Sequence, residues 1–390
     1  MIEKFRKTCL SCGGSLSAPL FESDNFPASA QDIPLKEELS KDEGITLRLR
    51  RCEKCGLFQF DCEPVSYYRD VIRAVGLSGT MKDLRRSDYR HMIDKYALSG
   101  KKFIECGCGN GDFLKVLSEF PVEIYGTEAN EGFAKEASEK LPDAHIVHAF
   151  PETADTLIPG APFDCFLSFN FLEHQPDPMS MLKCMYNNLS ENGYGLITVP
   201  SFEYILNEAK YYELIRDHIA NYTLSSLCIL CENAGFRVIE KGFIGIGDTL
   251  RVVVKKESTC GTAHSENTEA FENTLLKSFN SITKNVSGYV EALKSSGKTL
   301  SMWGAGHQGF TIASTTALKE YVSYIIDSAK FKQGRFAPAS HIPVVSPEYF
   351  NDHPTDVILV AAPLYVKEIS GTIRRIYGEK APEIKSILDF

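Results

Sequence analysis

Four cysteines near the start of the chain have the residue type and spacing to hold a metal ion. Cys9 and Cys12 form one Cys-x-x-Cys pair followed by glycine, and Cys52 and Cys55 form a second. Two such pairs complete a tetrahedral, all-thiolate site that is closed to substrate. The gap between the pairs exceeds the ~15–20 residues that are usual, so two unrelated pairs or a thioredoxin-like redox dithiol are alternatives. We expect a structural zinc ion.

A glycine-rich loop in the middle of the chain can bring the backbone close to a ligand. An apolar strand runs into Glu105, and a Gly-x-Gly-x-Gly pattern follows at Gly107, Gly109 and Gly111. Glycines in these positions let the backbone approach a bound molecule at the carboxyl end of a parallel strand. The dinucleotide site of a dehydrogenase is the alternative, although its spacing is Gly-x-Gly-x-x-Gly.

An acidic residue follows this loop at a spacing that suits a ribose contact. The next predicted strand ends in Glu128, 17 positions after Gly111. A carboxylate there can accept hydrogen bonds from both hydroxyls of a ribose. Residues 163–178 then predict a further buried strand and a helix, and residues 189–200 predict a turn and a fifth strand.

These features together resemble the class I S-adenosylmethionine-dependent methyltransferases. The resemblance implies that the glycine loop holds the amino-acid part of the cofactor and that Glu128 binds its ribose. It also implies that residues near Phe150 flank the adenine. The cofactor-binding residues assigned in this way are Glu105, Gly107, Gly109, Gly111, Glu128, Phe150 and Asn170.

Two histidines have neighbours that suit acid–base chemistry. Asp217 and His218 precede a predicted helix at residues 224–234, and an aspartate can orient a histidine that acts as a base. A histidine with the ordinary pKa of ~6.5 can take a carbon-bound or hydroxyl proton at neutral pH. His174 follows the fourth predicted strand, where cofactor and acceptor would meet, and is the second candidate. A purely packing role is the alternative for both histidines.

A second glycine motif lies near the end of the chain. Gly304, Gly306 and Gly309 follow a predicted strand and open a helix, and the strand at residues 321–327 ends in an acid. This placement meets the conditions for a Rossmann-type phosphate loop. Another buried strand, residues 356–362, indicates a small α/β unit, which either binds a ligand or serves as a scaffold.

The order of these elements predicts an α/β protein. The expected fold is a class I methyltransferase doubly wound sheet, preceded by a small zinc-binding module and followed by a second, smaller Rossmann-like α/β domain. We place the zinc-binding module at residues 1–75, the methyltransferase core at 76–258, a polar linker at 259–275 and the Rossmann-like domain at 276–390.

Composition and charge disfavour several classes of function. The 42 basic residues against 51 acidic ones give a net charge of −9, which leaves no basic surplus for wrapping nucleic acid. No apolar run approaches the ~20 residues that cross a bilayer, and the first residues lack the apolar core of a secretory signal. We therefore expect a cytoplasmic protein with reduced cysteines, a small-molecule substrate, and neither a membrane nor a nucleic-acid partner.

The whole arrangement resembles the deoxysugar C-methyltransferases, which act on nucleotide-linked 4-keto sugars. A zinc module, a methyltransferase core and a terminal Gly-Ala-Gly-x-x-Gly unit occur in that order, and residues 326–347 resemble the family's hallmark segment. The resemblance implies that His218 is the base, with Asp217 beside it, and that the other motif histidine is His174. The substrate-binding residues assigned with it are Tyr67, Tyr68, Tyr222, Gly304, Gly306, Gly309 and Arg335.

Departures from the family pattern leave the acceptor open. Ile215 replaces the family's active-loop tyrosine, Asp217 replaces its glutamate, and Pro338-Ala339 replaces the Pro-Gly of the terminal segment. The expected reaction is methylation of a carbon next to a ketone, in which His218 removes a proton and leaves an enediolate. Methyl transfer to oxygen or nitrogen of another small metabolite is one alternative, and a non-catalytic ligand-binding scaffold is another.

Overall fold

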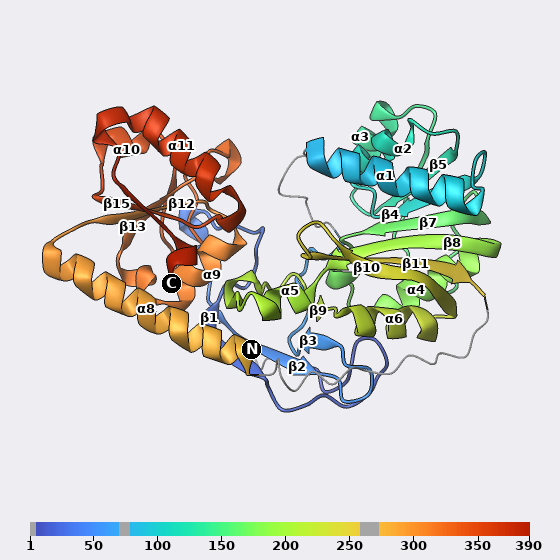
Figure 1. The fold of residues 1–390 in the computed structure, drawn as a ribbon, viewed down its shortest axis with the longest axis horizontal. Helices are drawn as coiled ribbons and strands as arrows, with labels where there is room; N and C mark the ends of the chain where they lie inside the picture. Colours follow the sequence, from blue (N-terminus) through green and yellow to red (C-terminus); the bar gives the residue numbers. More distant parts are fainter. Residues whose placement is uncertain (1–4, 70–78, 258–272) are drawn as a thin grey trace.

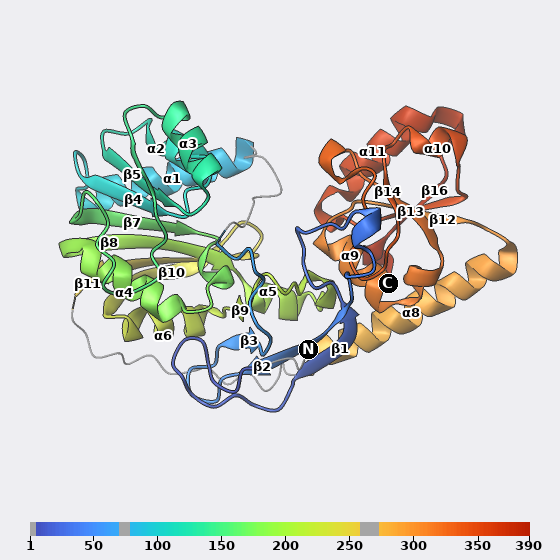
Figure 2. The same ribbon diagram turned by 180° about the vertical axis from the view of Figure 1, so that it is seen from behind.

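The computed structural model describes residues 5–69, 79–257 and 273–390. Figure 1 and, from behind, Figure 2 show two α/β lobes that lie side by side, with the first strands of the chain beneath them. The described residues form a seven-stranded, a five-stranded and a four-stranded sheet. None of the helices in these three ranges is long and apolar enough to cross a membrane.

The first lobe is built on the seven-stranded sheet, in the order β10-β11-β8-β7-β4-β5-β6. Its strands are β4 (Lys102–Cys106), β5 (Glu123–Glu128), β6 (His145–His148), β7 (Phe163–Phe169), β8 (Leu189–Pro200), β10 (Phe236–Ile244) and β11 (Thr249–Lys256). Strands β4 to β8 run parallel, whereas β11 runs antiparallel to both β8 and β10. The strand order reverses beside β4, and ligands of doubly wound sheets bind at such a switch point.

Helices cover both faces of this sheet (Figure 1). They are α1 (Gly79–Tyr96), α2 (Asp112–Leu117), α3 (Glu131–Lys140), α4 (Pro178–Asn188) and α6 (Leu224–Asn233). The short α5 (Phe202–Asn207) packs instead in the core that contains the N-terminal strands and the second lobe. Within β4, Phe103 packs on the side of α1 and α2, and Ile104 packs on the side of α4 and α6. Alternate residues of a strand point to opposite faces, so both faces of this sheet are buried. The doubly wound sheet predicted from the sequence is confirmed.

The second lobe contains the five-stranded sheet, in the order β14-β13-β12-β15-β16. Its strands, which all run parallel, are β12 (Leu300–Trp303), β13 (Val322–Ile326), β14 (Val344–Val345), β15 (Val357–Val360) and β16 (Glu383–Ser386). Its helices are α8 (Thr274–Ser296), α9 (His307–Thr315), α10 (Tyr349–Asp352) and α11 (Val366–Tyr377). Parallel strands that alternate with helices form βαβ units, so the smaller Rossmann-like unit is confirmed.

The four-stranded sheet joins the start of the chain to its middle. Its antiparallel strands are β1 (Phe21–Phe26), β2 (Ile45–Arg51), β3 (Phe58–Phe60) and β9 (Ala220–Asn221). Strand β9 lies between α5 and α6 in the sequence, yet Phe58 of β3 pairs with Asn221. The sequence prediction of a zinc-binding module at residues 1–75 did not include this pairing, because a two-residue strand leaves no periodic pattern.

One apolar core joins the N-terminal strands to the second lobe. The ring of Phe279 in α8 lies 5.5 Å from Phe21 of β1 and 4.9 Å from Tyr211, measured between ring centroids. Phe310 of α9 belongs to the same cluster. Burying a large apolar side chain contributes roughly 1.5–3 kcal/mol, so this core fixes the second lobe against β1.

Short 3-10 turns complete the described structure. They are η1 (Lys36–Glu38), η2 (Leu172–His174), η3 (Tyr211–Glu213), η4 (Ala317–Glu320), η5 (Lys330–Lys332), η6 (Pro363–Tyr365), η7 (Gly378–Lys380) and η8 (Ile387–Asp389). The linker predicted at residues 259–275 lies largely outside the described residues, and α8 begins at Thr274, inside its last positions. Residues 70–75 of the predicted zinc module also lie outside them.

Candidate active site and metal centre

The four N-terminal cysteines converge on one point. The Sγ atoms of Cys9, Cys12, Cys52 and Cys55 all lie within 4.8 Å of one another, and the Cys9–Cys55 and Cys12–Cys52 pairs are 3.5 Å apart. An ion with Zn–S bonds of ~2.3 Å places its tetrahedral sulfur ligands about 3.8 Å apart. The four sulfurs therefore fit an all-thiolate ion site with no position left for substrate.

The local backbone conformation and its N–H groups favour metal binding at this site. Gly13 and Gly56 follow the two cysteine pairs with φ values of 68° and 74°, a left-handed conformation that favours glycine. The N–H group of Ser11 points at Sγ of Cys9 at 3.3 Å. Such a donor stabilises a thiolate, which is the form of cysteine that binds metal.

The first glycine loop and Glu128 meet at the switch point of the seven-stranded sheet. The N–H of Gly109 donates to Oε2 of Glu128 at 2.7 Å, and the N–H of Asn130 donates to Oε1 at 2.8 Å. These contacts hold Glu128 beside the loop, where the sequence predicted that it meets the ribose.

The three glycines of the loop are needed for different reasons. Gly107, Gly109 and Gly111 have φ values of 68°, 55° and 80°. A Cβ at Gly107 would lie 2.6 Å from the ring of Phe171, and one at Gly111 would lie 3.1 Å from Ala137 of α3. A Cβ at Gly109 would meet no atom within 4 Å. The sequence interpretation gave all three to the ligand, whereas the structure packs protein against two and leaves open space only at Gly109.

Two further predicted cofactor residues lie at the same edge of the sheet as the glycine loop. Glu105, in β4, is 1% exposed, and Asn170, directly after β7, is exposed and has a φ of 50°. Strands β4 and β7 are paired neighbours. Because the carboxyl ends of parallel strands share one edge, the fold brings both residues to the loop, as the sequence predicted for residues of one site.

Aromatic side chains stand beside this loop. The ring of Phe150 lies 5.8 Å from Phe171 and 6.0 Å from Tyr68, measured between centroids. Half-buried rings of this kind offer faces and edges to a flat heterocycle. Tyr68, which the sequence assigned to the acceptor, therefore lies beside Phe150, which the sequence assigned to the cofactor. Phe171 was missed, because its packing on Gly107 is a tertiary contact.

A single loop, residues 211–218, is fixed by contacts with every part of the molecule. The carboxylate of Glu213 accepts a hydrogen bond from Nε2 of Gln308, at the start of α9, at 2.7 Å. The guanidinium of Arg216 donates to the carbonyl of Ala28 at 3.1 Å. The second lobe and the N-terminal segment (residues 5–69) thus both hold this loop, which ends in the predicted base, His218.

The side chain of Asp217 does not orient His218 as expected. Its Oδ1 accepts a hydrogen bond from the hydroxyl of Tyr67 at 2.7 Å, and its Oδ2 accepts one from the N–H of Ala30 at 3.1 Å. Its backbone carbonyl accepts from Nδ1 of His174 at 2.8 Å. The prediction is corrected: the carboxylate ties the loop to the N-terminal segment, and the main chain orients His174.

His174, His218 and Glu173 form a compact group beside this loop. The two imidazole centroids are 4.8 Å apart, and Nε2 of His174 lies 3.9 Å from Oε1 of Glu173. Burial lowers the pKa of His174, and burial together with His174 and His307 lowers the pKa of His218 well below its usual value. Burial raises the pKa of Glu173 to about 8. Both imidazoles are therefore neutral at neutral pH, and each keeps one lone pair.

Two residues that were predicted to bind substrate make hydrogen bonds within the protein. Tyr222 is 1% exposed, and its hydroxyl donates to the carbonyl of Leu172 at 3.5 Å. Arg335 donates to the carbonyls of Ile33 at 2.8 Å and Phe331 at 3.1 Å, which ties the second lobe to the N-terminal segment. The sequence did not indicate these contacts, because residue type and position along the chain do not reveal which side chains become buried or paired.

The second glycine motif forms the loop between β12 and α9. Gly304 has a φ of 111°, and a Cβ at Gly309 would lie 2.5 Å from the carbonyl oxygen of Gly304. The N–H of Ala305 donates at 2.9 Å to Asp327 after β13, much as Gly109 does to Glu128. Because the loop has the tight backbone of a Rossmann-type phosphate loop, it retains the local geometry for an anionic ligand.

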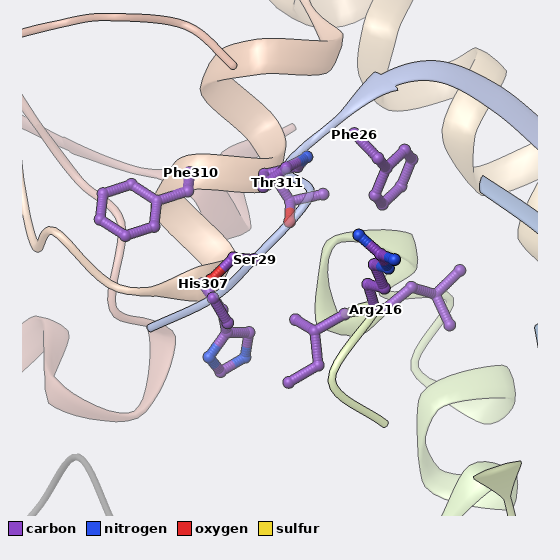
Figure 3. Close-up of a pocket in the computed structure, with 10 residues that line it drawn as sticks. Phe26, Ser29, Arg216, His307, Phe310 and Thr311 are labelled. Atoms are coloured by element: carbon purple, nitrogen blue, oxygen red, sulfur yellow. The ribbon is translucent and has the colours of Figure 1, made fainter. Parts of the chain in front are cut away.

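A small pocket lies between the three parts of the molecule. Figure 3 shows Phe26 and Ser29 of the N-terminal segment, Arg216 of the loop, and His307 and Thr311 of α9 around it. The residues that line it are Phe26, Pro27, Ser29, Ala30, Leu214, Ile215, Arg216, His307, Phe310 and Thr311. Both lobes and the N-terminal segment therefore border one space next to the loop that carries His218.

Sequence reasoning missed Glu173 and Glu213 as well as Phe171. Glu173 stands directly before His174 in the sequence, and this adjacency was the available indication of its place. Glu213 had no comparable indication, because its partners in α9 are distant in sequence.

Two family models match adjoining parts of the chain. The model for a methyltransferase domain matches residues 81–241, and the model for a C-methyltransferase C-terminal domain matches residues 241–384. The first spans most of the lobe that holds the glycine loop and Glu128, and the second spans the five-stranded lobe.

Similar proteins include two kinds of methyltransferase. C-methyltransferase NovU from Streptomyces niveus is 23% identical over 298 residues, which cover 69% of this chain and 68% of NovU. Ubiquinone biosynthesis O-methyltransferase from Pseudomonas entomophila (strain L48) is 27% identical over 103 residues, which cover 26% of this chain and 44% of that enzyme.

Solved structures that match the chain include an S-adenosylmethionine-dependent methyltransferase from Aquifex aeolicus, with 16% identity, a TM-score of 0.37, and coverage of 45% of this chain and 93% of that one. Another is the PH0226 protein from Pyrococcus horikoshii OT3, with 14% identity, a TM-score of 0.40, and coverage of 49% and 98%. The two family models and the similarity to NovU give the assignment. The chain is an S-adenosylmethionine-dependent methyltransferase whose second lobe matches the model for a C-methyltransferase C-terminal domain.

Proposed function

We propose that this enzyme methylates a carbon next to the ketone of a nucleotide-linked 4-keto sugar, with His218 as the base. The similarity to NovU, itself a C-methyltransferase, supports transfer to carbon. The phosphate-loop geometry of residues 304–309 supports an acceptor that carries a nucleotide.

The observation that carries this proposal is that the two lobes and the N-terminal segment all contact the loop of residues 211–218, which ends in His218. Glu213 ties the loop to the second lobe, and Asp217 ties it to the N-terminal segment. In the proposed step, the imidazole of His218 accepts the proton from the carbon beside the ketone, and the electron pair of that C–H bond passes into an enediolate. Bound S-adenosylmethionine supplies an activated methyl group for that carbon.

The other parts of the site hold the reactants. We assign Gly109 and Glu128 to the amino-acid and ribose parts of the cofactor, and Phe150 to its adenine. We assign the four cysteines to one structural zinc ion, which their spacing fits. The domain boundaries at residues 75 and 258 remain part of this proposal.

A screen of acceptors tests the function directly. The enzyme is incubated with methyl-labelled S-adenosylmethionine and a panel of nucleotide-linked 4-keto sugars, and NMR locates the label in any product. A label on the carbon beside the ketone is the expected result. A label on oxygen or nitrogen would replace this proposal by the heteroatom methyltransferase, and an absence of cofactor binding by calorimetry would favour a scaffold.

Glu128→Gln is expected to raise the dissociation constant for S-adenosylmethionine about 10- to 100-fold. A carboxylate is a charged acceptor, and hydrogen bonds to charged groups contribute about 1.5–3 kcal/mol. Isothermal titration calorimetry measures the change. Glu131→Gln, at an exposed position at the start of α3, is the matched control. Equal affinities for the two variants would contradict the assignment of Glu128.

Tyr67→Phe is expected to lower kcat about tenfold and to leave the cofactor affinity unchanged. Burial, with Asp217 nearby, raises the pKa of the Tyr67 hydroxyl above its usual range, so the hydroxyl stays protonated and donates to Asp217. Loss of this hydroxyl removes one of the hydrogen bonds that hold the loop of residues 211–218 in place. Tyr68→Phe is the control, because the Tyr68 hydroxyl contacts Glu152 at 3.4 Å and the substitution keeps the ring that lies beside Phe150. A change in KM alone would show that Tyr67 does not position the base.

A further inference from the structure

Glu173, His174 and His218 form a group that the proposed reaction uses only in part. The reaction needs the lone pair of His218 and gives Glu173 no task. Glu173 and His174 belong to the turn η2 after β7, whereas His218 comes from the loop before β9. The fold nevertheless brings the candidate ligand atoms of all three side chains within 4.8 Å of one another.

Glu173 is a buried carboxyl group that lies close to the two imidazoles. It is 2% exposed, and one of its oxygens lies within 4.8 Å of the ligand atoms of both histidines. Nε2 of His174, at 3.9 Å from Oε1, is beyond hydrogen-bonding distance. Buried carboxylates in proteins are normally paired, hydrogen-bonded or bound to a metal. A cation between Glu173 and the imidazoles would stabilise the carboxylate form of this side chain.

His174 is held in the tautomer that suits a metal ligand. Its Nδ1 lies 2.8 Å from the backbone carbonyl of Asp217. A carbonyl only accepts hydrogen bonds, so Nδ1 carries the hydrogen and Nε2 of the neutral ring carries the lone pair. Histidines that bind metals commonly donate their other ring N–H to a backbone carbonyl in this way. The free lone pair lies on the side of Glu173.

We propose that Glu173, His174 and His218 bind one divalent transition-metal cation, such as Zn²⁺, at a site separate from the four cysteines. Two imidazoles and one carboxylate are a ligand set for zinc and ferrous iron. Ligand atoms about 2.0–2.2 Å from an ion lie roughly 3–4 Å apart. Side-chain movements of about 1 Å therefore bring the ligand atoms of the three residues, now within 4.8 Å of one another, to these distances.

Occupancy of this site blocks the reaction proposed above, and this consequence rests on that proposed function. The cation takes up the lone pair with which His218 would accept a proton. Metal binding and proton removal thus exclude each other at His218. The loaded enzyme is the inactive form, and a chelator too weak to remove the ion of the four cysteines restores activity.

Metal content tests the site without reference to activity. Wild-type protein and Glu173→Gln are equilibrated with Zn²⁺ and dialysed, and the zinc is measured by mass spectrometry. The wild type is expected to hold one more ion per chain than Glu173→Gln. His218→Gln, which removes a ligand from the other loop, is expected to lose the same ion. His145→Gln, at an exposed position on β6, is the control that keeps it.

Cobalt distinguishes this site from the four cysteines. Co²⁺ bound by nitrogen and oxygen gives weak visible bands, whereas thiolate ligands add strong near-ultraviolet bands. Glu173→Gln should lose only the weak bands, and its cofactor affinity by calorimetry should show that the variant is folded. Equal metal content in wild type and both ligand variants, or loss of the ion in His145→Gln, would overturn the proposal.

Solvent exchange separates this inference from the proposed function. Deuterium uptake by a nucleotide-linked 4-keto sugar should stop when the site is loaded with Zn²⁺ and return after a chelator is added. Exchange that continues in a fully loaded enzyme would overturn His218 as the base and the predicted block, while the metal content would still support the site.

Discussion

His218→Gln is expected to lower the rate of methyl transfer by about 10²- to 10⁴-fold, the usual contribution of a general base. Glutamine is similar in size and can still form hydrogen bonds, but it cannot accept the proton. The same variant should abolish deuterium exchange at the carbon beside the ketone of the acceptor. NMR of the acceptor in heavy water measures that exchange separately from methyl transfer, with enzyme that keeps the ion of the four cysteines and holds none at Glu173, His174 and His218.

The cofactor site provides the internal check on this variant. The glycine loop and Glu128 are held by β4, β5 and their own hydrogen bonds, so the dissociation constant for S-adenosylmethionine should stay within about twofold of wild type. His353→Gln, at an exposed position in the second lobe, should leave both rates unchanged. Exchange at the wild-type rate in His218→Gln would show that another group removes the proton.

Cys52→Ser is expected to unfold the N-terminal strands and to remove most of the methyl transfer activity. Structural zinc contributes about 10 kcal/mol or more of binding free energy in small zinc-binding peptides, and one lost thiolate opens the closed site. Unfolding of these strands also disturbs the loop of residues 211–218, because β3 pairs with β9, which begins two residues after His218. Limited proteolysis should cut the variant before residue 69, at protease levels that leave the wild type intact.

Cys62→Ser is the matched variant for this experiment. Cys62 is a half-buried cysteine of the same segment that lies outside the group of four, so its replacement should leave zinc content and protease resistance close to wild type. Equal resistance and equal zinc content in Cys52→Ser would show that the four sulfurs do not hold a structural ion. The two lobes should stay folded in either variant, because each has its own buried sheet.

Features that depend on a few neighbouring residues could be predicted from the sequence. The paired cysteines and the glycine loops are set by spacing and by backbone conformations that glycine favours, such as the φ of 55° at Gly109. The contact between Glu128 and that loop was also predictable, because consecutive parallel strands of a doubly wound sheet usually lie side by side. The class of fold followed from the same alternation of strands and helices.

The identity of the groups around the base was decided only by the tertiary structure. Asp217 adjoins His218 in sequence, yet its carboxylate binds Tyr67 of the N-terminal segment, because that segment completes a sheet with β9. Glu173 meets His218 from a different loop. Sequence spacing constrains contacts within a turn or between consecutive strands, whereas contacts between distant loops depend on how the three sheets pack against one another. That packing buries Tyr222 and places the two histidines together, and no local pattern encodes it.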